Sequence, residues 1–187
     1  MNKYIKLISG AVSAAALSAV LCSCGNGGGL FAEPTPTPMP SVDAFAVLSL
    51  DDAKAAVNDE YELELAGGTV VNDGNVSTAT YSAVPKGSGD PIIVKVINRT
   101  ASISADDIWN DYENARLSRP SSELIEGIGY DAYIAYPSIH VYDRGCEIVI
   151  TASSGSGDKQ KEMLKDLAKT ATEKLEVIIP EEEEAIQ

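Results

Sequence analysis

Cysteine, histidine and basic residues are scarce in this chain of 187 residues. It has three cysteines and one histidine, and 14 Lys and Arg against 28 Asp and Glu give a formal net charge of −14. Three cysteines are too few for a scaffold held together by several disulfides. So large an acidic excess argues against a nucleic-acid binder, because such proteins neutralise phosphates with Lys and Arg. We therefore expect no nucleic acid among its partners.

Metal-binding and phosphate-binding motifs are also missing from the sequence. One His and, beyond residue 24, one Cys do not supply the several ligands of a standard zinc site. The predicted turn at residues 72–75 has oxygen-bearing side chains, but it lacks the D-x-D-x-D-G spacing and the later glutamate of a calcium loop. The phosphate-binding pattern G-x-x-x-x-G-K-[ST] is absent. The sequence therefore predicts neither a metal nor a cofactor.

One long apolar run is present near the start of the sequence. Residues 7–21 carry no charge, and Lys3 and Lys6 precede them. The run is shorter than the roughly 20 apolar residues that a membrane-spanning helix needs. A basic start followed by an apolar segment of this length is typical of a secretory signal peptide.

The end of this run, Leu21-Cys22-Ser23-Cys24, resembles the lipobox of bacterial lipoproteins. The resemblance implies cleavage before Cys24 and transfer of diacylglyceryl to its thiol, so that residues 1–23 are the signal peptide. Cys24 fits better than Cys22, because the bulky Leu21 would directly precede Cys22. We expect the lipid on Cys24 to hold the protein on the extracytoplasmic face of the cell membrane, since each buried CH₂ contributes ~0.8 kcal/mol. The membrane is thus its first expected partner.

Residues 24–42 are predicted to be a stalk between the lipidated cysteine and the body. Residues 25–29 are rich in glycine and favour a flexible coil, whereas proline at every second position from 34 to 40 favours a stiff polyproline II spacer. A docking motif for a partner domain is the alternative for the proline-rich run. At the other end, residues 181–187 begin with four glutamates, whose mutual repulsion predicts a disordered acidic tail.

The body, residues 43–180, alternates between helix and strand patterns. Capping patterns begin predicted helices at residues 49–58 and from residue 104 to before Pro120, and a third helix runs from about 159 to 175. Predicted strands cover residues 61–65, 76–84, 92–97 and 125–136, and a hairpin at 139–152 turns at 143–145. Gly67 and Gly68 predict a turn.

These elements predict one α+β domain, an antiparallel sheet with about three helices packed on it. Strands joined by short turns favour antiparallel pairing, and amphipathic helices must bury their apolar sides. The segments 127–133 (GIGYDAY) and 141–145 (VYDRG), followed by an Ile-rich strand and a helix, are similar to small Gram-positive lipoprotein domains of the PsbP-like class. That resemblance implies a sheet flanked by helices and a non-catalytic role, and it assigns no residue roles.

A Cys–His pair is the first candidate for catalysis, because Cys146 and His140 flank one turn. Strand alternation directs Ile139 and Val141 toward the core and His140 outward, whereas Cys146 shares the face of Val141. A bulge at Gly145 would change this parity. We expect a buried structural cysteine and an exposed histidine. The G-x-S-x-G pattern of serine hydrolases is absent as well, so no catalytic residue is predicted.

Four tyrosines, Tyr130, Tyr133, Tyr136 and Tyr142, fall close together and are the predicted contact residues for a ligand or partner. Rings with polar tips suit interfaces and ligand grooves. In one extended strand Tyr130 and Tyr136 share a face and Tyr133 takes the other, with Tyr142 beside Tyr133 or at the hairpin tip. The alternative is that the rings are half-buried and cover the sheet. Trp109 is predicted to be core.

The sequence thus predicts a membrane-anchored extracytoplasmic lipoprotein whose body is a non-catalytic binding or interaction module and not an enzyme. An unknown protein or a cell-wall component is the expected partner. The alternative is an extracytoplasmic hydrolase that acts through acidic residues. It requires two carboxylates to converge in a cleft.

Overall fold

The computed structural model describes residues 42–57, 61, 63–84, 90–100, 102–153 and 157–180. These residues belong to one compact unit. The predicted signal peptide, Cys24, nearly all of the stalk and the acidic tail lie outside the described residues. Within the described ranges, no helix is both long and apolar enough to cross a membrane.

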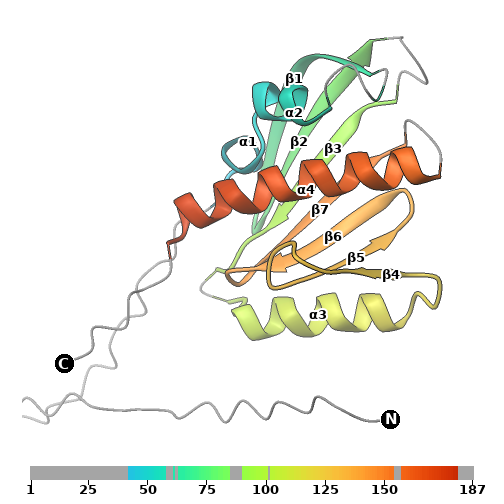
Figure 1. Cartoon of the computed structure of the whole chain (residues 1–187). Helices are drawn as coiled ribbons and strands as arrows, with labels where there is room; N and C mark the ends of the chain where they lie inside the picture. Colours follow the sequence, from blue (N-terminus) through green and yellow to red (C-terminus); the bar gives the residue numbers. More distant parts are fainter. Residues whose placement is uncertain are drawn as a thin grey trace, which may run out of the picture. The chain divides into compact units, whose positions relative to one another are not determined.

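A single antiparallel sheet of seven strands organises the described part of the chain (Figure 1). Every neighbouring pair of strands is antiparallel. Strands that follow one another in the chain are neighbours in each half of the sheet. At its centre, the strand at residues 92–97 pairs with the last strand, at residues 146–152. In spatial order the strands are β1 (Glu64–Asp73), β2 (Val76–Val84), β3 (Ile92–Ile97), β7 (Cys146–Ala152), β6 (Ser138–Asp143), β5 (Asp131–Ala135) and β4 (Glu123–Ile125).

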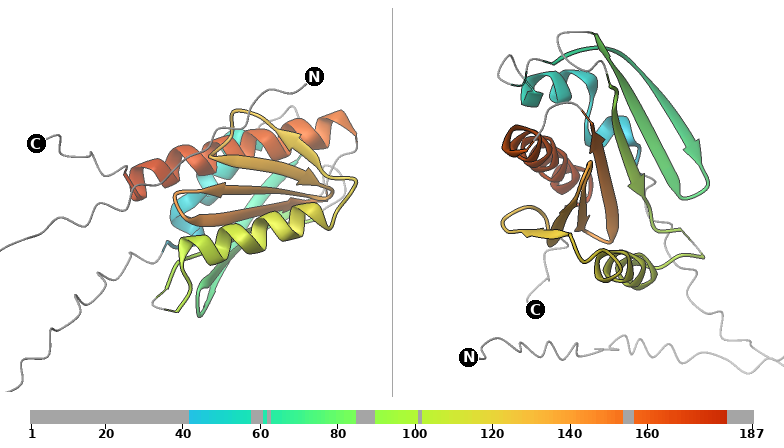
Figure 2. Two further views of the ribbon diagram at one scale, coloured as in Figure 1. Left: turned by 90° about the horizontal axis from the view of Figure 1, so that it is seen from below. Right: turned by 90° about the vertical axis from the view of Figure 1, so that its right-hand side faces the viewer.

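Helices lie on both faces of the sheet (Figure 2). One face is covered by α1 (Ala44–Val47), α2 (Leu50–Val57) and the long α4 (Asp158–Ile178), and α3 (Ala105–Leu117) packs on the opposite face across β5 to β7. The predicted α+β fold is therefore confirmed. The described residues contain one helix more than expected, because the four-residue α1 is too short to produce an apolar periodicity.

The main core fills the space between the sheet and α4. Alternate residues of β3 and β7, such as Val94 and Ile148, face it and are fully buried. All six members of the apolar stripe predicted for the last helix are also buried: Met163, Leu164, Leu167, Ala168, Ala171 and Leu175. Each fully buried large apolar side chain contributes about 1.5–3 kcal/mol to folding. This layer therefore holds α4 against the sheet.

The predicted turn at Gly67 and Gly68 is wrong, because both glycines lie inside β1 at a break in its register with β2. The pairing shifts between Ala66 and Thr69, which marks a β-bulge. Gly67 has φ +60°, and a Cβ on Gly68 would lie 2.9 Å from the rings of both Phe45 and Tyr81. The glycines are needed for the bulge and for close packing. Of the described residues in the predicted strand at 61–65, only the last two are in a strand, because β1 begins at Glu64 and continues through the glycines to Asp73.

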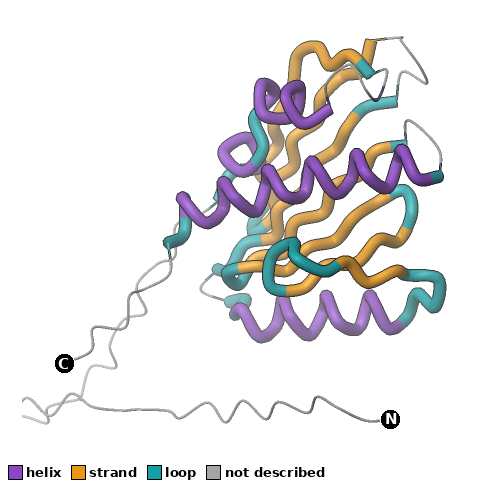
Figure 3. Tube along the Cα trace, in the orientation of Figure 1, coloured by secondary structure: helices purple, strands orange, loops and turns teal. Residues whose placement is uncertain are grey.

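The single strand predicted for residues 125–136 is also wrong, since it divides into β4 and β5 with a loop between them (Figure 3). Gly127 and Gly129 in this loop have φ +77° and +58°, which extended strands do not allow. The hairpin predicted for 139–152 is confirmed. Its two-residue turn, Arg144-Gly145, has positive φ at both positions, as a tight hairpin requires.

Candidate functional site

The two exposed tyrosines of the predicted contact set stand at opposite ends of β5. Tyr130 is 68 % exposed and precedes the strand, and Tyr136 is 51 % exposed and follows it. Strands rise about 3.3 Å per residue, so roughly 20 Å of extended chain separates the two. Tyr133, between them, is fully buried. The four tyrosines therefore do not form one contact surface.

Tyr133 and Tyr142 belong to an aromatic cluster between the sheet and α3. The ring centroids of Tyr112 and Tyr133 are 5.1 Å apart, and those of Trp109 and Tyr142 are 4.9 Å apart. Tyr130 joins the cluster through Trp109, at 5.6 Å. Edge-to-face and tilted rings at such distances stabilise one another. The aromatic cluster is Trp109, Tyr112, Tyr130, Tyr133 and Tyr142.

The expectation that Tyr130 and Tyr136 share a face opposite Tyr133 is wrong for Tyr130. Strand alternation does not extend back to this residue, because β5 begins at Asp131 and Gly129 before it is left-handed. The ring of Tyr130 consequently packs toward α3, on the same side as Tyr142. Trp109 lies in the cluster and is partly buried.

Hydroxyl groups of the aromatic cluster are used for structure. The hydroxyl of Tyr112 donates to Asp131 Oδ1 at 2.7 Å, and that of Tyr142 donates to the Ala105 carbonyl at 3.1 Å. Burial raises the pKa of Tyr112, Tyr133 and Tyr142, and for Tyr112 the bond to Asp131 raises the pKa further. These phenols therefore stay protonated at neutral pH, and those of Tyr112 and Tyr142 act as donors.

A polar group lies beside this cluster on the same face of the sheet. The ring of His140 stacks on Tyr133 with a 4.6 Å centroid separation and a 5° interplanar angle. His140 Nδ1 lies 3.0 Å from Glu147 Oε1, and Arg119 Nη1 lies 3.0 Å from His140 Nε2. Arg119 Nη1 also donates to the Tyr133 hydroxyl at 3.2 Å. The group thus joins β5, β6, β7 and the end of α3.

Sequence reasoning did not select Arg119 or Glu147, and it expected an exposed His140. That expectation is wrong, because the aromatic rings and Arg119 cover the imidazole and leave it 8 % exposed. Glu147 could have been found from the hairpin register, which pairs it with Tyr142 on the same face of the sheet as His140. For Arg119 no local pattern exists, since its position depends on how α3 packs.

Cys146 lies on the opposite face of the sheet from His140, as the strand parity predicts. It pairs with Asp143 across the hairpin and belongs to the core beneath α4. Burial raises the pKa of its thiol to about 11, so the thiol is not a nucleophile at neutral pH. The expectation of a buried structural cysteine is confirmed, and the two side chains form no catalytic pair.

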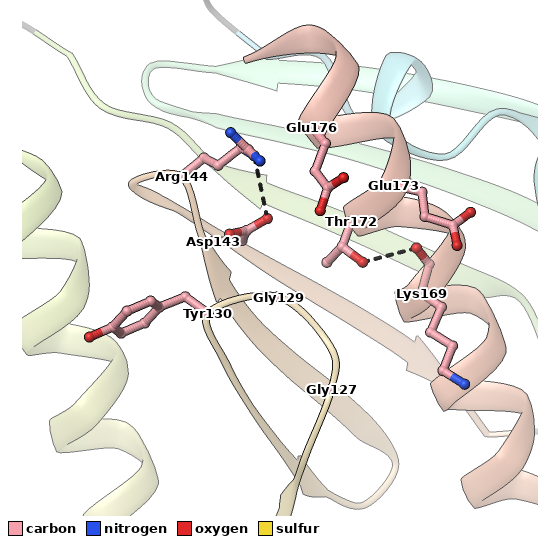
Figure 4. A pocket seen from close by; sticks show the side chains of 9 residues that line it. All are labelled: Gly127, Gly129, Tyr130, Asp143, Arg144, Lys169, Thr172, Glu173 and Glu176. Atoms are coloured by element: carbon pink, nitrogen blue, oxygen red, sulfur yellow. Dashed lines mark hydrogen bonds and ion pairs between the residues drawn. The ribbon is translucent and has the colours of Figure 1, made fainter. Parts of the chain in front are cut away.

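A groove of about 790 Å³ opens between α4 and the loop that joins β4 to β5 (Figure 4). The helix contributes one wall, and the loop and the β6–β7 turn contribute the other. Figure 4 shows the ring of Tyr130 pointing away from α4, so that its base lines the rim while its ring lies toward α3. The groove is lined by Gly127, Gly129, Tyr130, Asp143, Arg144, Lys169, Thr172, Glu173 and Glu176.

Backbone geometry shapes the loop side of the groove. A Cβ on Gly129 would lie 2.6 Å from Val141 Cγ1, so the loop approaches β6 more closely than another residue would permit. Arg144 donates from Nη1 to the Ile179 carbonyl at 2.9 Å and thereby ties the hairpin turn to the end of α4. These contacts fix the distance between the two walls.

Charges of both signs line the groove. Lys169, Glu173 and Glu176 are exposed on successive turns of α4, and Arg144 and Asp143 face them from the β6–β7 turn, with Arg144 Nε 3.9 Å from Asp143 Oδ2. A ligand with several polar groups would find donors and acceptors on both walls. Within the described ranges, no cluster of three or more His, Cys, Asp or Glu side chains could hold a metal ion.

The chain matches no protein-family model, no curated protein and no solved structure.

Proposed function

We propose that the protein is a lipoprotein anchored on the extracytoplasmic face of the cell membrane through Cys24, and that its body binds a ligand or partner without catalysis. The lipobox-like Leu21-Cys22-Ser23-Cys24 supports the anchor, and two or three acyl chains would make the attachment stable. The likeness of its C-terminal half to PsbP-like lipoprotein domains agrees with a non-catalytic role.

The observation that carries the binding role is the groove between α4 and the β4–β5 loop. Its volume of about 790 Å³ lies in the range of small-ligand sites, which bury most of their ligand. Charged side chains of both signs, and the backbone of the β4–β5 loop, supply polar contacts. The contact role belongs to the groove, whose rim includes the base of Tyr130, and the buried Tyr133 takes no part in it.

Binding without catalysis agrees with where the reactive side chains lie. The thiol of Cys146 is buried in the core, and His140 is held by Glu147 and Arg119 beneath the end of α3. Neither residue lines the groove. A ligand in the groove would therefore be held by charged side chains and backbone, without a thiol or an imidazole beside it.

Hydrolysis through acidic residues is the second candidate, and one observation favours it. The carboxylates of Asp143, Glu173 and Glu176 line the same groove, as acid–base chemistry on a glycosidic bond would require. The two functions differ in their products. If the protein binds without catalysis, each ligand of the groove should be recovered unchanged after long incubation. Hydrolysis would instead release fragments of the ligand, and the Glu176→Gln variant should not release them.

The anchor is tested by expressing the full chain in a bacterial host and separating membranes from soluble protein. Wild type and Cys22→Ser should stay with the membrane fraction and incorporate labelled palmitate. Cys24→Ser should lose the label and leave the membrane fraction. If Cys24→Ser keeps the label, the lipid is attached elsewhere and this assignment is overturned.

The binding role is tested by a thermal-shift screen of the Cys24→Ser chain. The panel holds cell-wall fragments, sugars, peptides, lipids and nucleotides. A ligand at 100 times its Kd adds about 2.7 kcal/mol of stability, which raises the melting temperature of a domain of this size by on the order of 5 °C. At least one class should give such a rise. A panel without any rise would contradict a small-ligand site in the groove.

A further inference from the structure

A second pocket, of about 400 Å³, opens where α3 ends and β5 turns into β6. It shares no lining residue with the groove beside α4. Arg119 and His140 line its polar side. Ala135, Tyr136 and Pro137 line the other side, where Tyr136 leaves half of its surface exposed. The volume lies at the lower end of the range for small-molecule sites.

Arg119 gives this pocket a positive charge, and no described carboxylate forms an ion pair with it. Its Nη1 bonds to the Tyr133 hydroxyl and to His140 Nε2, and neither of these partners is a carboxylate. Among the ion pairs of the described residues, none includes Arg119. Nε and Nη2 of the guanidinium accordingly remain for a ligand, in the fork geometry that matches a carboxylate.

The hydrogen bonds around His140 fix which nitrogen carries its proton. A guanidinium has no acceptor, so His140 Nε2 must accept from Arg119 and the proton must sit on Nδ1, which donates to Glu147 Oε1. The imidazole thus stands between Arg119 and Glu147. Glu147, which is 7 % exposed, lies on the far side of the ring and makes no direct contact with the guanidinium.

We propose that this pocket binds a small organic carboxylate with a flat apolar body. The carboxylate would pair with Arg119, and the apolar body would lie against Tyr136, Pro137 and Ala135. The protein as a whole carries a strong negative charge, so general attraction does not draw anions to it, and affinity has to come from this local cation. The site is independent of the groove beside α4.

The single histidine of the chain makes the test direct, because its imidazole signals in a ¹⁵N NMR spectrum need no assignment. Benzoate is titrated into the Cys24→Ser chain, and benzamide serves as the neutral isostere. Benzoate should shift the His140 signals in a saturable manner, and benzamide should leave them in place. Arg119→Gln should weaken benzoate binding by at least about tenfold, whereas Lys54→Gln, which removes one exposed charge from α2, should bind it like wild type.

Three results would overturn the proposal: no shift with benzoate, equal shifts with benzamide, or unchanged benzoate binding in Arg119→Gln. A spectrum of the free protein with the proton on Nε2 would contradict the geometry itself. A titration with N-acetylphenylalanine separates two sources of the same chemistry. Tighter binding than benzoate would assign the pocket to the carboxyl end of a peptide, and weaker binding would assign it to free acids.

Discussion

His140 Nδ1 lies 3.0 Å from Glu147 Oε1, on adjacent strands and beneath the ring of Tyr133. Both side chains are nearly buried, so the imidazole is the donor that compensates a carboxylate withdrawn from water. A buried polar group whose partner is removed keeps its desolvation penalty. The pair therefore is a buried polar contact beside the aromatic cluster.

Replacing His140 by Phe keeps a ring on Tyr133 but removes the donor to Glu147. We expect a loss of about 1.5–3 kcal/mol in the free energy of unfolding, measured by urea denaturation. The double variant His140→Phe/Glu147→Met should recover part of this loss, because no carboxylate is then left unpaired. A double variant less stable than His140→Phe alone would show that the pair is not coupled in this way.

Replacing Tyr133 by Ala should reduce the stability of the fold much more than replacing Tyr130 by Ala. Tyr133→Ala opens a cavity under α3 and should cost about 3–5 kcal/mol, as large aromatic truncations in a core do. Tyr130 is largely exposed and touches Trp109 and Tyr142 at the edge of the cluster, so Tyr130→Ala should cost only about 1 kcal/mol. Urea denaturation of both variants checks this order, and equal losses would contradict the assignment of Tyr133 to the core.

Alkaline solution should weaken the fold. Burial raises the pKa of Cys146 from 9.0 to about 11 and that of Tyr81 from 10.0 to about 12. The folded chain then holds protons that the unfolded chain releases, so stability is fully present below pH 9 and falls as the pH rises through about 11 to 12. Urea midpoints between pH 7 and 11 measure the fall.

Cys146→Ala serves as the control for the alkaline effect. It removes the thiol, so the free energy of unfolding should fall less between pH 9 and 11 than it does in wild type, by on the order of 2 kcal/mol. The variant is less stable at every pH because of the lost packing, which leaves the slope as the informative quantity. An unchanged slope would show that the thiol ionises normally in the folded protein.

Local patterns were sufficient where an element is defined by its own residues. Ser104 accepts from the Asp107 backbone and begins α3 where the capping pattern places it, and β3 occupies the predicted β-branched run at residues 92–97. The apolar residues of α4 likewise recur at the spacing that places them on one face of a helix. In these elements propensity, capping and burial all favour the same structure.

Local patterns failed where a residue's conformation depends on distant neighbours. Gly67 and Gly68 have the composition of a turn, and the rings of Phe45 and Tyr81 against Gly68 explain why they lie within a bulged strand. The candidate sites also depend on residues that are distant in the sequence. Tyr130 was selected for its ring, but the groove beside it is formed by α4, which begins almost thirty residues later in the chain.

The central claim, that the groove between α4 and the β4–β5 loop is the binding site, is tested most directly by a matched pair of variants. Lys169 lines the groove, whereas Lys159 is exposed on the first turn of the same helix and does not. Tryptophan at either position removes one positive charge and adds the same bulk. The Kd of the ligand found in the screen is measured by calorimetry for both variants and for wild type.

We predict that Lys169→Trp obstructs the groove and raises the Kd by at least about tenfold, which corresponds to 1.4 kcal/mol, while Lys159→Trp binds like wild type. Both variants should melt within a few degrees of wild type, because each residue is exposed on α4. If Lys169→Trp binds the ligand as tightly as Lys159→Trp does, the ligand occupies another site and the groove is not the functional surface of this protein.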